Sequence, residues 1–199
     1  MRNTAVRQIE VSKKLTIKKL MKKIFSFLLL AIITFISCEK DDICDANTPT
    51  TPRLVIDFYN ITSPSVKKNV SNLKVIGEGM KDGIIFNLGS TGETQYLSNG
   101  NTISIPLKTN ANATKYRFIL NSGNSNPALI DTDEVTISYT HNDVYVSRAC
   151  GYKTLFTLEP TNPILQTAVP ATKAKWMQAI SVEKTNIDNE NETHLKIFF

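Results

Sequence analysis

Alternation of apolar and polar residues is clearest at Val135-Thr136-Ile137-Ser138-Tyr139 and again at Val144-Tyr145-Val146-Ser147. With a period of two, every second side chain lies on one face, which is typical of a strand with one buried face. The intervening residues, Thr140-His141-Asn142-Asp143, include an Asn and an Asp, which tolerate left-handed turn conformations. The stretch therefore predicts a β-hairpin with its turn at residues 140–143.

Similar alternating or β-rich runs recur on both sides of this stretch. They predict strands at residues 53–60, 73–76, 84–88, 102–107, 114–120, 153–157, 176–182 and 194–199. The segment 163–175 fits either a short helix or a long loop. No segment predicts a helix long enough to cover a parallel sheet. About nine short strands with irregular connections predict an all-β fold, namely an antiparallel β-sandwich of Greek-key or immunoglobulin-like type.

The segment that ends at residue 37 has the order of an export signal. Two lysines precede an apolar run over residues 24–36, and a small serine precedes Cys38. As a helix this run would be about 20 Å long, against a hydrocarbon thickness of roughly 30 Å. Residues 1–37 are therefore interpreted as a signal peptide, with an uncleaved membrane anchor and a buried helix as the alternatives. Met21 is the favoured start, because it gives the signal an ordinary length.

The end of this signal resembles the lipobox of bacterial lipoproteins. Phe35-Ile36-Ser37-Cys38 fill the four motif positions, with Phe35 in place of the more common leucine. The resemblance implies that Cys38 receives a diacylglycerol on its sulfur and becomes the mature N-terminus. The next residues, Glu39-Lys40-Asp41-Asp42, resemble the export signal of Bacteroidota lipoproteins, although an ordinary charged linker is the alternative. The implied location is the outer membrane, lipid-anchored, with exposure at the cell surface favoured over the periplasmic leaflet as the alternative.

Composition divides the rest of the chain into a tether and a domain. Residues 38–52 are dominated by Asp, Thr, Pro and Asn, which predicts a lipidated flexible tether. Residues 53–199 have the length of one domain and predict the β-sandwich. Eight of the 23 basic and one of the 18 acidic residues precede Cys38, so 15 basic and 17 acidic residues follow. This balance argues against a nucleic-acid partner.

Two cysteines remain if Cys38 is acylated. Cys44 and Cys150 are predicted to form a disulfide, because an exported compartment is oxidising. A reactive thiol or a metal-binding pair is the alternative, but neither cysteine has a neighbouring His.

Three further segments resemble an uncharacterised lipoprotein family of Bacteroidota. They are Val144-Tyr145-Val146-Ser147-Arg148-Ala149-Cys150-Gly151-Tyr152, Cys44-Asp45 and His194-Leu195-Lys196-Ile197-Phe198-Phe199. The resemblance would cover most of residues 38–199. It implies an origin and an architecture but no activity, since that family has none assigned.

Residue types that carry chemistry are sparse in the predicted domain. His141 and His194 are the only imidazoles, and neither lies in a nucleophile motif, so surface or structural roles are expected. The acidic cluster Asp131, Asp133 and Glu134 could begin a calcium site, but it lacks the Gly and the distant Glu of an EF-hand loop. A solvated charged stretch that discourages edge pairing is the favoured interpretation.

The aromatic residues allow two interpretations. Core packing is favoured over a sugar-stacking surface for Trp176, Tyr96, Tyr145 and Tyr152. We therefore expect no catalytic, metal-binding or cofactor-binding residues and no cofactor. The leading hypothesis is a non-enzymatic binding or structural module, held at the outer membrane by its lipid, with a protein or glycan partner. An envelope hydrolase with two carboxylates that meet in space is the alternative.

Substitution Cys38→Ala should abolish incorporation of a fatty-acid analogue and release the protein from the membrane fraction, because the acceptor sulfur is lost. Metabolic labelling followed by fractionation measures both effects. The Cys44→Ala variant serves as the control and should stay labelled. Equal labelling of Cys38→Ala and the wild type would contradict the assignment.

Overall fold

A computed structural model describes residues 21–26 and 43–199. Cys38 and its neighbours, including the predicted lipobox and export signal, lie outside these ranges. Contacts within the chain divide it into residues 1–44 and residues 45–199, and the second unit holds every described strand. Residues 21–26 are helical. Within the described ranges, no helix is both long and apolar enough to cross a membrane.

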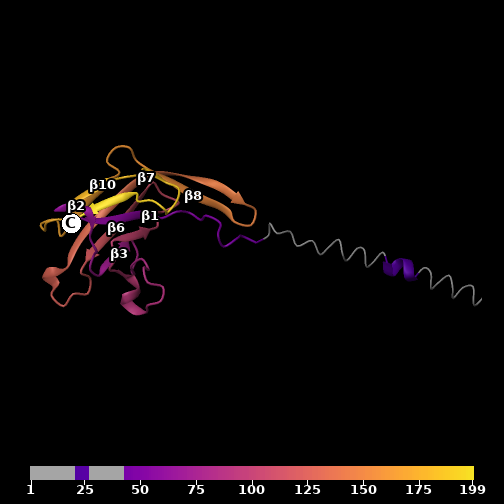
Figure 1. The fold of residues 1–199 in the computed structure, drawn as a ribbon, viewed down its shortest axis with the longest axis horizontal. Helices are drawn as coiled ribbons and strands as arrows, with labels where there is room; N and C mark the ends of the chain where they lie inside the picture. The colour runs from indigo at the N-terminus through magenta and orange to yellow at the C-terminus, as the bar shows by residue number, and fades with distance from the viewer. Residues whose placement is uncertain (1–20, 27–42) are drawn as a thin grey trace, which may run out of the picture. The chain divides into compact units, whose positions relative to one another are not determined.

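The first sheet has five strands with β1 at its centre (Figure 1). Strand β1 pairs in parallel with β12 and antiparallel with β2 and β5, and β10 pairs with β12. The strands are β1 (Leu54–Asn60), β2 (Ser63–Lys67), β5 (Thr102–Ile105), β10 (Ala179–Val182) and β12 (Leu195–Phe198).

The second sheet has seven strands in the order β11-β8-β7-β6-β3-β4, with β9 paired to β7. All its pairings are antiparallel. The strands are β3 (Leu73–Gly77), β4 (Leu97–Ser98), β6 (Ala113–Leu120), β7 (Asp131–Ser147), β8 (Gly151–Leu158), β9 (Ile164–Val169) and β11 (Asn186–Ile187). Two 3-10 helices, η2 (Gly92–Tyr96) and η3 (Pro127–Leu129), lie in the connections.

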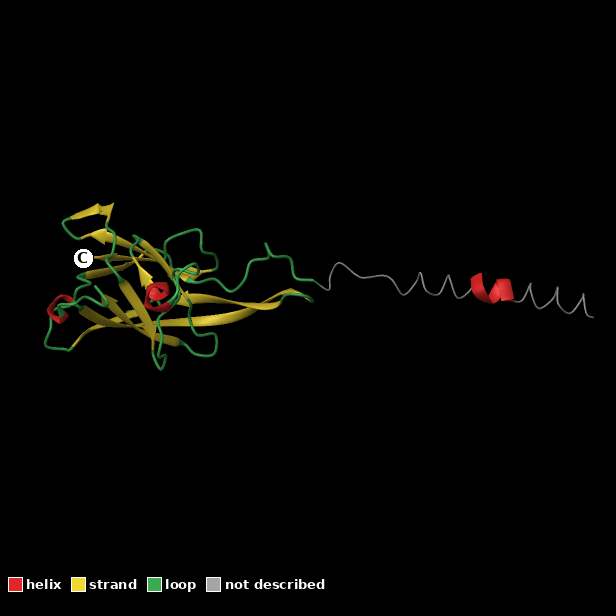
Figure 2. Cartoon of the chain, turned by 90° about the horizontal axis from the view of Figure 1, so that it is seen from below, coloured by secondary structure: helices red, strands yellow, loops and turns green. Residues whose placement is uncertain are grey.

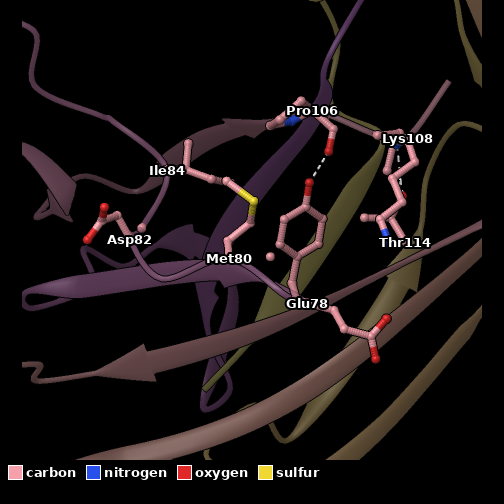
Figure 3. A pocket seen from close by; sticks show the side chains of 11 residues that line it. Glu78, Met80, Asp82, Ile84, Pro106, Lys108 and Thr114 are labelled. Atoms are coloured by element: carbon pink, nitrogen blue, oxygen red, sulfur yellow. Dashed lines mark hydrogen bonds between the residues drawn. The ribbon is translucent and has the colours of Figure 1, made fainter.

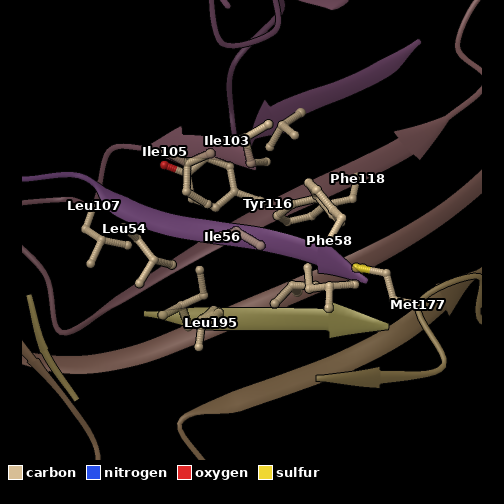
Figure 4. Close-up of a cluster of buried hydrophobic side chains, with 14 of the residues drawn as sticks. Leu54, Ile56, Phe58, Ile103, Ile105, Leu107, Tyr116, Phe118, Met177 and Leu195 are labelled. Atoms are coloured by element: carbon tan, nitrogen blue, oxygen red, sulfur yellow. The ribbon is translucent and has the colours of Figure 1, made fainter. Parts of the chain in front are cut away.

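One hydrophobic core joins the two sheets, as expected for a sandwich. Leu54, Ile56 and Phe58 on β1 contribute from the first sheet, and Tyr116 and Phe118 on β6 contribute from the second (Figure 4). The tryptophan predicted to be core is indeed buried: Trp176 stacks near Phe58 with ring centroids 6.5 Å apart. The all-β sandwich prediction is therefore confirmed, with 12 described strands where about nine were expected from the alternation.

A buried carboxylate ties together the outer face of the first sheet. Asp57 on β1 is 3% exposed, and its oxygens accept hydrogen bonds from the hydroxyls of Thr102 (2.5 Å) and Thr193 (2.7 Å). The Lys67 ammonium lies 2.7 Å away. Burial alone would raise the pKa of Asp57, but these hydrogen bonds and the lysine charge hold that pKa below its ordinary value. Asp57 thus stays charged and links β1 to β2, β5 and the residues before β12.

The hairpin predicted at residues 140–143 is wrong, because β7 runs without interruption from Asp131 to Ser147. The turn lies at residues 148–150, where Gly151 with φ +70° and a register shift near Tyr145 reverse the chain. Asp143, expected in the turn, instead accepts a cross-strand hydrogen bond from the Thr154 hydroxyl (2.7 Å). Polar residues that tolerate a turn also suit a strand whose face is solvated.

Two other local expectations differ from the structure. Residues 163–175 contain strand β9 rather than a helix or a long loop, since Ile164–Val169 finds a free edge on β7. Residues 84–88 form no strand, although the Ile84 amide donates to the Val75 carbonyl (2.8 Å). Whether a segment becomes a strand here depends on whether an unpaired sheet edge lies next to it. The alternation of apolar and polar residues does not show where such an edge is.

A two-stranded arm extends from the second sheet. The first half of β7 lies between β6 and β9, whereas its second half pairs with β8 alone. Figures 1 and 2 show this ribbon projecting beyond the other strands. We call residues 143–153, the outer part of this hairpin, the β7–β8 arm. At its base the Thr154 amide donates to the Thr51 hydroxyl (3.0 Å), so the residues just before β1 already contact the domain.

Substitution Phe58→Ala should lower the free energy of unfolding by about 3–5 kcal/mol, because the ring is fully buried and its removal leaves a cavity between the sheets. Urea denaturation of both proteins measures the difference. Val66→Ala on β2, where the side chain is 55% exposed, is the control and should change stability by less than about 0.5 kcal/mol. Equal effects of the two substitutions would contradict the assignment of Phe58 to the core.

Candidate functional site

An apolar pocket of about 290 Å³ lies where the chain leaves β3 and β5. The 77–84 segment after β3 forms one side, the 106–108 segment after β5 forms the other, and Thr114 and Tyr116 on β6 contribute from the second sheet (Figure 3). Its apolar lining comes mainly from Met80, Ile84, Leu107 and Tyr116. The pocket therefore offers a small hydrophobic recess rather than a polar cleft.

Side-chain hydrogen bonds hold the 106–108 side of this pocket in place. The Tyr116 hydroxyl donates to the Pro106 carbonyl, and the Lys108 amide donates to the Thr114 hydroxyl (2.9 Å). The Tyr139 hydroxyl lies 2.6 Å from that of Thr114 and donates to the Lys108 carbonyl (2.7 Å). Burial raises the pKa of Tyr116, so the phenol stays protonated as a donor. This side of the pocket is thus fixed before any ligand binds.

Two carboxylates belong to the pocket lining, but they do not converge. Figure 3 shows Glu78 and Asp82 on opposite sides of Met80, with their carboxylates directed apart. General acid–base or glycosidase chemistry would need two carboxyl groups that flank one substrate bond. The pocket does not have that arrangement.

A charged hollow of about 210 Å³ adjoins the apolar pocket. The two share Gly77, Glu78, Met80 and Tyr116, and the hollow adds Lys115, Arg117 and Glu134. The Lys115 ammonium lies 2.7 Å from the Glu134 carboxylate, whose hydrogen bond raises the pKa of Lys115. Together these residues give the apolar recess a polar margin.

The sequence did not predict this pocket. In the sequence, residues 77–83 simply connect the predicted strands 73–76 and 84–88, and Tyr116 lies within the predicted strand 114–120. One available signal was Met80, an apolar side chain in a connection otherwise made of Gly and charged residues. Met80 is 65% exposed, so its position in the connection does not reflect burial in the core.

The predicted acidic cluster is not brought together. Asp131 pairs with Lys173 (2.5 Å), and Glu134 pairs with Lys115 (2.7 Å). Asp133 is fully buried, so the expectation of a solvated charged stretch is wrong for this residue. Strand alternation places Asp133 and Glu134 on opposite faces of β7. Among the described residues, no group of three or more His, Cys, Asp or Glu side chains is placed to hold a metal ion.

Asp133 is buried in the sandwich, where it is hydrogen-bonded by groups of the 166–177 segment. Its Oδ2 accepts hydrogen bonds from the Met177 amide (3.0 Å) and the Gln166 side-chain amide (2.9 Å), and its Oδ1 has no hydrogen-bond partner. Burial raises the pKa of Asp133, and these hydrogen bonds only partly oppose it. Asp133 lines neither the apolar pocket nor the charged hollow, so it is a structural group.

The two histidines lie apart on different elements. His194 is fully buried, and its Nδ1 accepts a hydrogen bond from the Val55 amide (3.0 Å), so the neutral ring carries its proton on Nε2. Burial lowers the pKa of His194 and favours this neutral form. His141 lies on β7, where its ring packs edge-on against Tyr139. Both positions agree with the structural roles expected from the sequence.

The four aromatic residues considered for a stacking surface are dispersed. Trp176 is buried, and Tyr96 is partly buried below the Lys74 ammonium. Tyr145 and Tyr152 are 58% and 69% exposed on the β7–β8 arm, so the expectation that they are core residues is wrong. They lie beyond the end of the first sheet, and a sequence pattern does not show where a facing sheet ends.

The predicted cysteine pair lies at disulfide distance. Cys44 and Cys150 are both disulfide-bonded, and Cys150 is in the turn between β7 and β8. In the sequence, Cys44 follows Cys38 by six positions.

Comparison with known proteins gives a family without an assigned activity. A family described as a family of unknown function, DUF6452, matches residues 72–199. The chain belongs to this family. No curated protein and no solved structure matches the chain. The DUF6452 match includes every residue that lines the apolar pocket, so the pocket lies within the family domain.

Substitution Asp133→Asn should change how stability depends on pH. Because folding raises the Asp133 pKa above its ordinary value of 3.8, stabilisation by the protonated carboxyl is complete below that value and is lost as pH rises through the folded pKa. The Asn variant lacks this loss. Its unfolding free energy should therefore rise relative to the wild type as the pH increases above the ordinary carboxyl pKa of 3.8.

Urea denaturation at several pH values measures this difference. Thr132→Val, on the neighbouring residue of β7, removes no ionisable group and serves as the control. Its difference from the wild type should not vary with pH. A difference between Asp133→Asn and the wild type that is equally independent of pH would contradict the assignment of a raised pKa to Asp133.

Proposed function

We propose that the chain is a lipid-anchored protein of the Bacteroidota outer membrane whose sandwich is a non-enzymatic binding module. The signal-like order of residues 24–38 and the lipobox resemblance support the anchor at Cys38. The charged residues 39–42 support export to the cell surface. In this proposal the DUF6452 domain is the part that meets a partner outside the membrane.

The apolar pocket beside Tyr116 is the observation that carries the binding function. Its volume of about 290 Å³ lies at the lower end of the range for ligand sites, roughly 300–1,000 Å³. It has room for one ring or one branched side chain rather than for a large molecule. The hydrogen bonds that fix its 106–108 side mean that little ordering is needed when it is filled.

The surroundings of the pocket favour a protein partner over a glycan. A sugar requires several convergent hydrogen-bonding groups or an open aromatic face, whereas Tyr116 is only 4% exposed and its hydroxyl already donates to Pro106. An apolar recess with Lys115, Arg117 and Glu134 beside it matches the hydrophobic centre and polar rim of a protein interface. We therefore propose that the pocket receives an apolar side chain of a protein.

The hydrolase alternative receives less support. Glu78 and Asp82 diverge in the apolar pocket, and the buried Asp133 lies in neither the pocket nor the charged hollow. A glycoside hydrolase requires two carboxyl groups that flank the bond to be cleaved.

Binding of indole, the ring of a tryptophan side chain, tests the proposed pocket. Saturation-transfer NMR should detect indole on the wild-type protein. Met80→Asp should abolish the signal, because it places a charge in the apolar lining. Met80 is 65% exposed, so this substitution should leave the fold intact. Leu88→Asp, at a side chain that is 92% exposed and lies outside the pocket, is the matched control and should bind indole as the wild type does.

N-acetylglucosamine serves as the competing probe in the same experiment. It should give no signal that depends on Met80. Binding of the sugar in place of indole, or an equal indole signal from Met80→Asp and the wild type, would refute the proposed pocket.

A further inference from the structure

We propose that the tip of the β7–β8 arm rests on the lipid bilayer that holds the Cys38 anchor. The contact would be made by the exposed pair Tyr145 and Tyr152, together with Arg148 in the turn between their strands. This inference rests on the proposed function, because it needs an acylated Cys38. It adds a second, non-covalent membrane contact and a fixed orientation of the domain.

The two tyrosines form one exposed aromatic unit. Tyr145 on β7 and Tyr152 on β8 are directly opposite in register, and their ring centroids are 5.4 Å apart at an interplanar angle of 68°. They are 58% and 69% exposed, so the sandwich does not bury them. Tyrosine combines an apolar ring with a polar hydroxyl, and it is enriched where proteins meet the membrane interface.

The disulfide is the reason to expect the bilayer at the tip of the arm, because it limits the distance between this tip and Cys38. Cys44 lies six positions after Cys38, a span of at most about 20 Å, and a disulfide adds about 6 Å between Cα atoms. Cys44 and Cys150 are disulfide-bonded, and Cys150 is two residues from Tyr152. An acyl chain on Cys38 would therefore keep the tip of the arm within a short distance of the lipid surface.

Without the disulfide the restraint would be much weaker. Further along the same segment, Thr51 contacts the second sheet by accepting a hydrogen bond from the Thr154 amide. Thr51 lies thirteen positions after Cys38, a span of up to about 45 Å. The bridge thus roughly halves the reach of the anchor and selects the arm as the part of the domain nearest the membrane.

Charge at the tip is compatible with this surface. Arg148 is exposed in the turn, whereas Lys153, which follows Tyr152 on β8, is partly exposed on the opposite face of the strand. Asp143, the acidic residue of the arm, accepts the hydrogen bond of Thr154. An exposed arginine in the turn that follows the strand of Tyr145 suits the phosphates of a bilayer surface.

The depth of a tryptophan at position 152 tests the proposal. The acylated full-length Tyr152→Trp protein is reconstituted in vesicles of phosphatidylethanolamine and phosphatidylglycerol. Its emission should shift to shorter wavelength and lose intensity when the lipids carry bromine. The native Trp176 is buried in the core, so it contributes a constant background.

A matched tryptophan elsewhere on the domain provides the control. Leu165→Trp replaces a side chain on β9 that is 64% exposed, and its emission should not respond to brominated lipid. A Tyr152→Trp protein that also carries Cys44→Ser and Cys150→Ser should lose much of the quenching, because its tether is longer. Quenching that persists unchanged in this variant would overturn the role of the disulfide.

The possible failures can be told apart. Mass spectrometry and vesicle sedimentation report acylation of Cys38, and an unacylated protein would overturn both the anchor and this inference. An acylated, sedimenting protein whose Tyr152→Trp emission ignores brominated lipid would overturn the inference and leave the anchor intact. A shift of that emission by a soluble oligosaccharide without vesicles would assign the pair to sugar binding instead.

Discussion

The sandwich depends on the central strand β1, which is buried and is paired with β12 on one edge and with β5 on the other. Leu54 to Phe58 are all at most 6% exposed, so this strand is covered on both faces as well as paired on both edges. One edge is closed by β12, near the end of the chain: Val55 bonds to His194, 139 residues away. The first sheet can therefore be completed only when both ends of the domain are present.

Polar groups inside this arrangement are used as connectors. Asp57 binds hydroxyls of Thr102 and Thr193 and the ammonium of Lys67, which belong to three separate segments. His194 pairs with Val55 through its ring where the regular strand pairing begins. Burying a carboxylate or an imidazole is unfavourable unless it is hydrogen-bonded. Asp57 and His194 therefore favour the strand register that brings their partners within hydrogen-bonding distance.

The proposed binding features lie at the margins of this framework. The apolar pocket is formed by the segments that leave β3 and β5, and the tyrosine pair lies on the part of β7 and β8 that extends past the first sheet. Both are positioned by strands that belong to the core, because β6 carries Tyr116 and β7 carries Tyr145. A rigid sheet with variable connections is a common way to present binding groups.

The sequence by itself determined the fold class, most strand positions, the cysteine pair and the core role of Trp176, because period-two alternation and composition are local properties. Only the tertiary structure decided that β7 continues through residues 140–143, that Ile164–Val169 is a strand, and that Tyr145 and Tyr152 are exposed. It also separated Asp133 from Glu134 and brought Met80 beside Tyr116. These outcomes depend on which edges and faces are covered by distant segments, and that covering is a property of the whole packed chain.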